Sequence, residues 1–85
     1  MREELVGKVS HYYGHLGVAT VHLSAELKVG DTIHVKGHTS DFTQKVDSMQ
    51  IGHKIVERAG GGEDIGIKVI EHSREHDLIY RVSEV

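Results

Sequence analysis

Leu27-Lys28-Val29-Gly30-Asp31-Thr32-Ile33-His34-Val35-Lys36-Gly37 is the stretch that decides how this chain folds. In its second half, Ile33 and Val35 point to one side and the polar residues around them point to the other, which is the pattern of a half-buried strand. Gly30-Asp31 predicts a tight turn before that strand, because glycine adopts positive φ easily and aspartate can bond nearby backbone. A slip of one residue would turn the apolar side to water, so the pattern fixes the register.

Working outward from this strand, the chain shows further short segments of alternating apolar residues, separated by turns that contain glycine. Strands are predicted over residues 5–11, 18–23, 32–36, 65–69 and 77–82. Short strands at this spacing indicate a sandwich or a barrel, and closure into a barrel removes exposed sheet edges. We therefore expect an all-β fold, a small closed or partly closed antiparallel β-barrel of about six or seven strands. The residues predicted to face its core are Leu5, Val9, Val21, Leu23, Ile33, Val35, Val46, Ile65, Ile67, Val69, Leu78 and Val82.

Residues 40–59 allow two interpretations. Phe42, Val46 and Met49 stand at helical spacing, and the polar residues before them could cap a helix. The strand interpretation needs a change of phase near Asp47-Ser48, which a β-bulge would supply. The periodicity alone favours neither interpretation.

The composition is that of one small soluble domain, which we expect to span residues 1–85. The 85 residues are 38% hydrophobic and 27% charged, which is ordinary for a globular protein with a single modest core. No run reaches the ~18 apolar residues of a membrane span, the start Met1-Arg2-Glu3-Glu4 is unlike a signal peptide, and there is no cysteine. We therefore expect a cytoplasmic protein without disulfides or membrane contact. The net charge of −3 argues against a generic, charge-driven nucleic-acid binder.

Two further segments accompany the opening stretch: Gly14-His15-Leu16-Gly17-Val18-Ala19-Thr20-Val21 and Gly60-Gly61-Gly62-Glu63-Asp64-Ile65-Gly66. Together the three segments resemble the second domain of translational GTPases, the β-barrel of the elongation factor Tu type, over residues 5–82. The resemblance implies that fold, and it divides residues 40–59 into two strands, 42–51 and 55–59. The phosphate-binding pattern Gly-x4-Gly-Lys-Ser/Thr is absent from the sequence, so we expect the barrel without the GTPase and without a bound nucleotide.

In the resembled domain, a shallow pocket near the glycine-rich turn accepts the 3′ end of aminoacyl-tRNA. The resemblance implies binding residues on that turn and on a neighbouring strand, namely Leu16, Gly17, Val18, Met49, Gln50 and His53. A pocket for a terminal adenosine needs stacking and edge contacts, which Leu16 and Gln50 could supply. The alternative is that Leu16 and Met49 simply close the end of the barrel. A basic rim is predicted from Lys45, Lys54 and Arg58, with a solvated strand face as its alternative.

The eight histidines invite a metal hypothesis, because three pairs stand four residues apart: His11/His15, His34/His38 and His72/His76. On a strand that spacing separates the side chains by ~13 Å, so we expect no metal site and no cofactor. His72-Ser73-Arg74-Glu75-His76 resembles the motif of inverted zinc proteases, but there the motif lies on a helix. Here it falls between two predicted strands, so we predict no catalytic residues.

These observations lead to three hypotheses of function. The first is a non-enzymatic binding module that contacts RNA or the translation machinery, as the resemblance implies. The alternative is a protein-interaction module that acts with a collagenase-like peptidase, because a similar barrel is appended to such enzymes. A metal-dependent hydrolase is a remote third. We expect the stable partner to be a protein, which includes a second copy of the chain, and any RNA binding to be weak.

Overall fold

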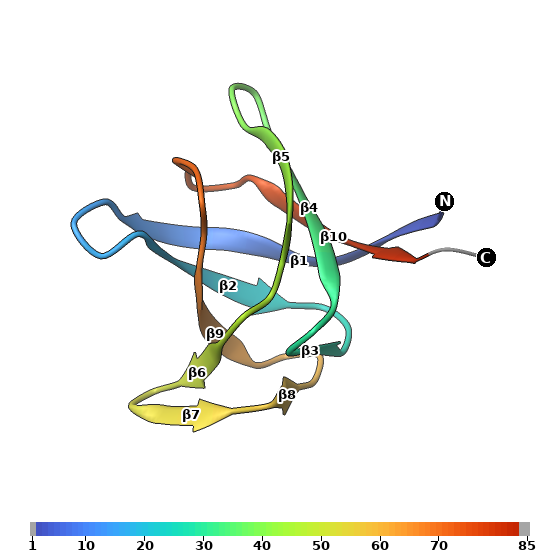
Figure 1. Ribbon diagram of the computed structural model, residues 1–85, viewed down its shortest axis with the longest axis vertical. Helices are drawn as coiled ribbons and strands as arrows, with labels where there is room; N and C mark the ends of the chain where they lie inside the picture. Colours follow the sequence, from blue (N-terminus) through green and yellow to red (C-terminus); the bar gives the residue numbers. More distant parts are fainter. Residues whose placement is uncertain (1, 84–85) are drawn as a thin grey trace.

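The computed structural model describes residues 2–83, which form an antiparallel all-β fold, as the sequence predicts (Figure 1). The strands are β1 (Arg2–Tyr13), β2 (Val18–Leu23), β3 (Leu27–Lys28), β4 (Thr32–Lys36), β5 (Asp41–Lys45), β6 (Met49–Ile51), β7 (Lys54–Val56), β8 (Arg58–Ala59), β9 (Asp64–Lys68) and β10 (Leu78–Ser83). Over residues 2–83 no helix has the length and apolar character needed to cross a membrane.

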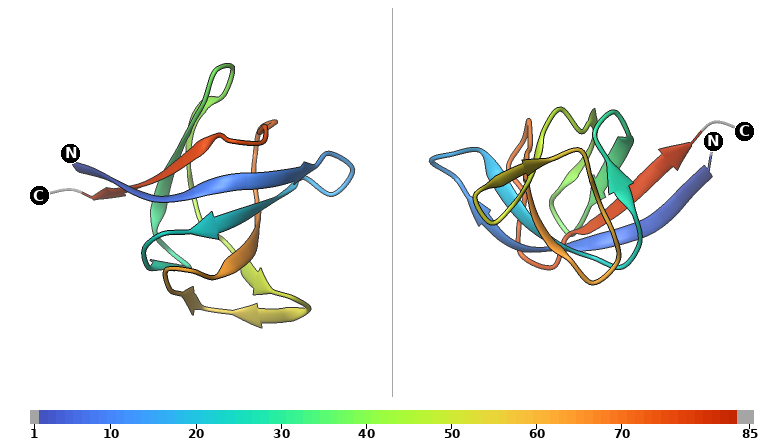
Figure 2. Two further views of the ribbon diagram at one scale, coloured as in Figure 1. Left: turned by 180° about the vertical axis from the view of Figure 1, so that it is seen from behind. Right: turned by 90° about the horizontal axis from the view of Figure 1, so that it is seen from below.

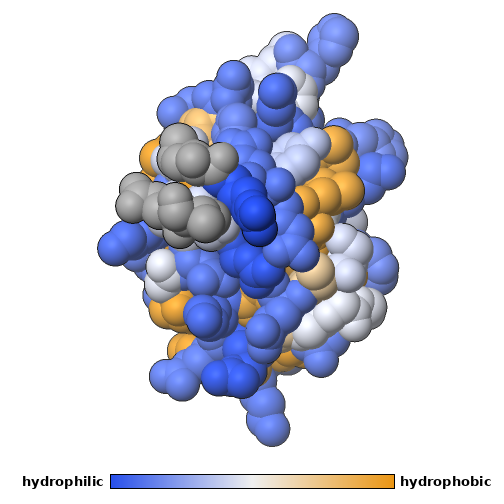
Figure 3. All heavy atoms as spheres, turned by 90° about the vertical axis from the view of Figure 1, so that its right-hand side faces the viewer, coloured by the Kyte–Doolittle hydropathy of each residue, from blue (hydrophilic) through white to orange (hydrophobic). Residues whose placement is uncertain are grey.

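One sheet contains most of the strands, in the order β5-β4-β10-β1-β2-β9-β6-β7, and β3 pairs with β8 in a separate ribbon. The long strand β1 joins two parts of this sheet, because Arg2 lies opposite Ser83 of β10 and Tyr13 lies opposite Val18 of β2. Figure 2 shows β1 and β10 running together toward the two chain ends, with the sheet curved around the interior. Hydrophilic residues dominate the face near the chain ends, with apolar atoms at its margins (Figure 3).

The sequence predicts a closed or partly closed barrel, and no closed barrel is found, because the paired order of the described strands ends at β5 on one side and at β7 on the other. β5 and the segment at the end of β9 are connected by hydrogen bonds of the Gln44 side chain and not by a ladder of backbone hydrogen bonds. Its Nε2 donates to the carbonyl of Lys68 at 2.8 Å, and its Oε1 accepts from the N–H of Ile70 at 2.8 Å. A side-chain amide can do this because it carries one donor group and one acceptor, like a peptide unit.

Residues 40–59 form four short strands, so the strand interpretation is confirmed and the helix is wrong, but each of the two strands predicted, 42–51 and 55–59, is divided into two. Phe42, Val46 and Met49 are buried, as the strand interpretation requires. β5 ends before Val46 because the backbone N–H and carbonyl of Val46 bond to the turn at Gly30-Asp31 and not to the strand β4. The N–H of Val46 donates to the carbonyl of Asp31, and its carbonyl accepts from the N–H of Gly30, both at 2.9 Å.

Nine of the predicted core residues are buried: Val9, Val21, Leu23, Ile33, Val35, Val46, Ile65, Ile67 and Val69. The prediction is wrong for Leu5, which is 46% exposed, while Val6 is fully buried. The ladder between β1 and β10 shifts between Leu5 and Gly7, and this β-bulge reverses which side chain enters the core. Gly7 is needed there because a Cβ would lie 2.7 Å from Cγ1 of Val21.

The predicted inward face of β10 is also wrong. Ile79 is fully buried opposite Val35, whereas Leu78 and Val82 are only half-buried. The next residue on the same face of β10 as Ile79 is Arg81, whose Nη1 donates to the carbonyl of Glu26 at 2.8 Å. The apolar residues of β10 therefore gather on its outer face, so a count of apolar residues selects the wrong side.

His34, on the outer face of β4, connects three strands. Its Nδ1 lies 2.8 Å from Oε2 of Glu3 on β1, and its Nε2 lies 2.5 Å from Oδ1 of Asp41 on β5. Its side chain is 16% exposed, and its ring lies beside that of Tyr80 on β10. The hydrogen bond with Asp41, and then that with Glu3, raise the pKa of His34 above its usual value, against the opposing effect of burial. The same contact with His34 lowers the pKa of Asp41, to which Lys36 also contributes.

We expect this cluster to make the stability of the chain fall as the pH rises above the unfolded pKa of histidine, ~6.5. Because the pKa of His34 is higher in the folded state, its contribution is complete below the unfolded value of ~6.5 and is lost as the pH passes the folded value. Urea unfolding between about pH 5.5 and pH 9 should therefore show a falling midpoint, and His34→Gln should flatten the profile. An unchanged profile in His34→Gln would assign the decline to another group.

Candidate functional site

The outer face of β2, β9, β6 and β7 carries a row of side chains that crosses the sheet. Thr20 lies opposite Gly66, Gly66 lies opposite Gln50, and Gln50 lies opposite Ile55. The residues next to Thr20 and Gly66 along their strands are buried, because successive side chains of a strand point to opposite faces. The row is therefore the solvent side of a sheet whose other side is core.

Gly66 forms the floor of a cleft in the middle of this row, because it contributes no side chain between Thr20 and Gln50. The cleft has a volume of about 470 Å³, within the range of ligand pockets. It is lined by Tyr13, Leu16, Val18, Thr20, Gln50, Gly52, His53, Asp64, Ile65 and Gly66. We refer to these residues as the Gly66 cleft.

The rim of the Gly66 cleft is apolar on the side of the hairpin between β1 and β2. Tyr13 is 45% exposed and Leu16 is 67% exposed. A single exposed leucine needs no explanation, but large apolar side chains beside a concave surface are typical of an interaction site.

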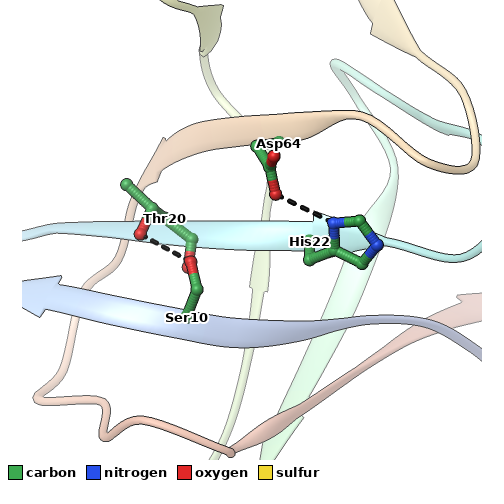
Figure 4. Close-up of polar contacts among 4 residues, drawn as sticks. All are labelled: Ser10, Thr20, His22 and Asp64. Atoms are coloured by element: carbon green, nitrogen blue, oxygen red, sulfur yellow. Dashed lines mark hydrogen bonds and ion pairs between the residues drawn. The ribbon is translucent and has the colours of Figure 1, made fainter.

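Two polar pairs lie on the outer face of β1, β2 and β9 beside the cleft (Figure 4). Oγ of Ser10 and Oγ1 of Thr20 are 2.9 Å apart, and Nδ1 of His22 lies 2.9 Å from Oδ1 of Asp64. Ser10 therefore bonds to Thr20 and not to His22, so the four residues do not form a Ser-His-Asp relay. The side chains of His22 and Asp64 are 60% and 73% exposed, which makes them a solvated surface pair.

A smaller hollow of about 80 Å³ adjoins the Gly66 cleft and shares Val18, Gln50 and Gly66 with it. Lys68, the outward residue at the end of β9, lines this hollow. The concave surface as a whole therefore runs along β9, from Asp64, past Gly66, to Lys68.

The structure brings four of the six predicted binding residues, Leu16, Val18, Gln50 and His53, to the Gly66 cleft. Gly17 lies in the hairpin turn with φ of 64°, and its carbonyl accepts from the N–H of Val69 at 2.9 Å. Met49 is fully buried in the core, so its side chain does not reach the cleft. Whether the four residues at the cleft bind a ligand stays a prediction.

The three residues of the predicted basic rim lie on different strands and are not among the lining residues of the Gly66 cleft. Lys45 ends β5, Lys54 begins β7, and Arg58 lies on β8 with its Nη1 3.9 Å from Oε2 of Glu26. This placement agrees with the alternative of solvated strand faces.

Sequence reasoning did not single out Tyr13, Thr20, Gly52, Asp64 or Gly66 as site residues. A signal was present in the strand Asp64–Lys68, whose outward positions hold a carboxylate, no side chain and an ammonium group. Only the pairing of this strand with β2 and β6 shows that the missing side chain leaves a cleft.

His72 and His76 lie in the loop between β9 and β10 and not on a helix, as expected. With His11 and Tyr12, part of this loop lines a separate cavity of about 460 Å³, where the rings of Tyr12 and His72 meet edge to face. Among the residues that the structure describes, no three His, Cys, Asp or Glu side chains gather in a way that could hold a metal ion.

Comparison with known proteins finds similar sequences within three curated peptidase-type proteins. The chain is 41% identical over 80 residues to an uncharacterized protease of Methanocaldococcus jannaschii, a match that covers 93% of this chain and 20% of that protein. It is 40% identical over 78 residues to a collagenase of Porphyromonas gingivalis, covering 89% of this chain and 22% of that protein. The chain thus spans about a fifth of the length of the curated relatives it matches. A scan against models of known protein families finds no match.

The fold resembles that of solved structures from Geobacillus thermoleovorans. The C-terminal domain of a putative U32 peptidase superposes with a TM-score of 0.89 at 20% identity, over 94% of this chain and 93% of that one. A selenomethionine variant of that domain gives a TM-score of 0.85 at 22% identity, over 89% and 96% of the two chains.

These findings overturn the resemblance to a translation factor. The similar sequences described above are named a protease and collagenases, and the similar structures are named as the C-terminal domain of a U32 peptidase, so these findings point to peptidase-type proteins and not to a translation factor. The three glycine-containing segments are turn and strand patterns, which unrelated β-folds share because the same backbone conformations require them. The chain is therefore similar in sequence to a segment of peptidase-type proteins and has the fold of a U32 peptidase C-terminal domain.

Proposed function

We propose that this chain is a non-catalytic module that binds a protein and that it serves a collagenase-like or U32-type peptidase as an accessory domain. The proposal rests on one combined observation. The chain is 41% identical over 80 residues to a segment that makes up a fifth of a protease, and it has the fold of a peptidase C-terminal domain. A segment that covers so small a share of its relatives is more readily an accessory unit than the catalytic one.

The geometry of the surface supports a binding role. Ser10 forms its hydrogen bond with Thr20, and His22 pairs with Asp64, both in exposed positions. A serine nucleophile would instead need a hydrogen bond to its base, and Ser10 and His22 do not form one. The Gly66 cleft, in contrast, offers a concave surface with an apolar rim, which is the usual form of a recognition site.

A chimera of the Porphyromonas gingivalis collagenase tests the proposal. The matched segment of that protein is deleted in one variant and replaced by this chain in another, and both are compared with the intact protein for collagen hydrolysis. We expect the deletion to lose activity, the chimera to recover it, and the isolated chain to have none. Full activity in the deletion variant, or hydrolysis by the isolated chain, would contradict the proposal.

Leu16→Glu is the companion test on the chain itself. Leu16 is 67% exposed, so the charge should weaken binding to a protein partner while the melting temperature changes by less than a few degrees. Binding is measured by titration calorimetry against the collagenase without its matched segment, with nuclease-treated samples to remove RNA. A large loss of stability would instead place Leu16 in the core, and partner loss on nuclease treatment alone would favour RNA.

A further inference from the structure

We infer that the Gly66 cleft and the adjoining hollow bind an extended peptide segment in which a large apolar side chain lies between a basic and an acidic residue, each two positions away. This inference rests on the proposed function, because it names the part of the protein partner that the module recognises. It is carried by the spacing, the shape and the charges of one strand face.

The spacing comes from β9. Asp64, Gly66 and Lys68 occupy alternate positions on its outer face, so neighbouring members of the set are about 6.8 Å apart. An extended peptide has the same repeat, with side chains of residues i, i+2 and i+4 on one side. A peptide lying along β9 can therefore place three successive side chains over these three positions.

The middle position is shaped for an apolar side chain. Gly66 leaves the floor open, and Tyr13, Leu16 and Val18 provide apolar walls. The volume of about 470 Å³ accommodates a phenylalanine or leucine side chain with room for backbone. Gln50 and Thr20 flank the same floor, and the amide of Gln50 can both donate to and accept from a peptide group.

The two ends carry opposite charges. The Asp64 side chain is 73% exposed and engages His22 through Oδ1. Lys68 lines the hollow at the other end. A basic residue over Asp64 and an acidic residue over Lys68 are thus complementary, whereas a uniformly anionic strand such as RNA would meet the carboxylate of Asp64. Either chain direction of the peptide satisfies this pattern.

Synthetic peptides provide the direct probe. The peptide Lys-Ser-Phe-Ser-Glu with blocked ends should bind the chain in titration calorimetry or NMR, with shifts confined to the cleft residues. Replacing its Phe by Gly should weaken binding by about tenfold to a hundredfold, the value of burying one aromatic side chain. Peptides with two Lys or two Glu should bind about twofold to fivefold more weakly, the range of exposed charge pairs. Equal binding of all four peptides would overturn the inference, as would tighter binding of a uridine pentanucleotide.

Filling the cleft tests the site without disturbing the fold. A Cβ on Gly66 would lie 3.7 Å from Cγ1 of Val18, an ordinary contact, and valine suits a strand. Gly66→Val should therefore keep the melting temperature and weaken peptide binding by about tenfold or more. Gly60→Val is the matched control, since its added Cβ meets nothing within 4 Å and Gly60 does not line the cleft. Equal peptide binding in the two variants would overturn the inference.

Charge reversal tests the assignment of the two ends. In Asp64→Lys both ends of the cleft are basic, so the variant should prefer the peptide with two Glu over Lys-Ser-Phe-Ser-Glu. In Lys68→Glu both ends are acidic, so that variant should prefer the peptide with two Lys. Both residues are exposed, so neither change should unfold the chain. Unchanged preferences would remove the charge complementarity from the inference and overturn it.

The failure of this inference can be distinguished from that of the proposed function. If the collagenase chimera is active and insensitive to Gly66→Val, the module binds its partner elsewhere and only the inference falls. If the chimera is inactive and the isolated chain binds none of the peptides, both fall.

Discussion

Replacing Ile67 by alanine should lower the free energy of unfolding by about 2–5 kcal/mol, the range for removing a large aliphatic side chain from a core. Ile67 is 1% exposed on β9, opposite Ala19 of β2 and Met49 of β6. Its loss leaves a cavity between strands that are already paired and cannot easily close around it. Urea unfolding followed by circular dichroism measures the change, which is a large share of the ~5–15 kcal/mol that stabilises a typical domain.

Ile55→Ala is the matched control for this prediction. Ile55 is 77% exposed on β7, so the same change of side chain should cost less than about 0.5 kcal/mol. If the two variants lost equal stability, the inward register of β9 would be wrong.

Replacing Gly37 by alanine should cost about 1–3 kcal/mol, because the added methyl group overlaps the carboxylate of Asp77. Asp77 is 4% exposed, and its Oδ2 accepts the N–H of Arg74 at 2.9 Å, so the carboxylate cannot move without losing this bond. The change should appear as a lower urea midpoint with an unchanged slope.

Two controls isolate the steric cause. Gly60→Ala adds a methyl group that meets nothing within 4 Å, and it should leave stability unchanged or raise it by less than about 1 kcal/mol. In the background of Asp77→Ala, Gly37→Ala should cost much less than in the parent chain, because the clash is gone. Additive losses in the double variant would show that the two residues act independently.

The sequence predicted those strands whose apolar residues stand on one side only. Ile33 and Val35 on β4, and Ile65 and Ile67 on β9, alternate with polar residues or glycine, and all four are buried as predicted. In such strands only one orientation buries the apolar side chains, so the pattern alone determines which face points to the core. Leu16 and Gln50 line the Gly66 cleft, but they were named as binding residues only from the resemblance to a translation factor, which the comparisons overturn.

Tertiary structure decided the strands that carry apolar residues on both sides. On β1, a bulge against β10 buries Val6 and exposes Leu5, and on β10 the neighbours of Ile79 bury that residue and not Leu78. The choice between two apolar faces depends on the partner strands, which lie far away in the chain, and no local pattern contains it.

The same holds for the candidate site and for the closure of the sheet. Gly66 becomes the floor of a cleft only because Thr20 and Gln50 flank it from β2 and β6. From the sequence alone, Gln44 is a polar residue of β5 with no assigned partner. Only the fold brings the carbonyl of Lys68 within hydrogen-bond distance of its side chain. Composition, alternation and turn residues thus determined an antiparallel all-β chain and the face of its one-sided strands, since these follow from the solvation of each residue. Which strands meet, where the sheet stays open and where it is hollow was decided by non-local hydrogen bonds and packing.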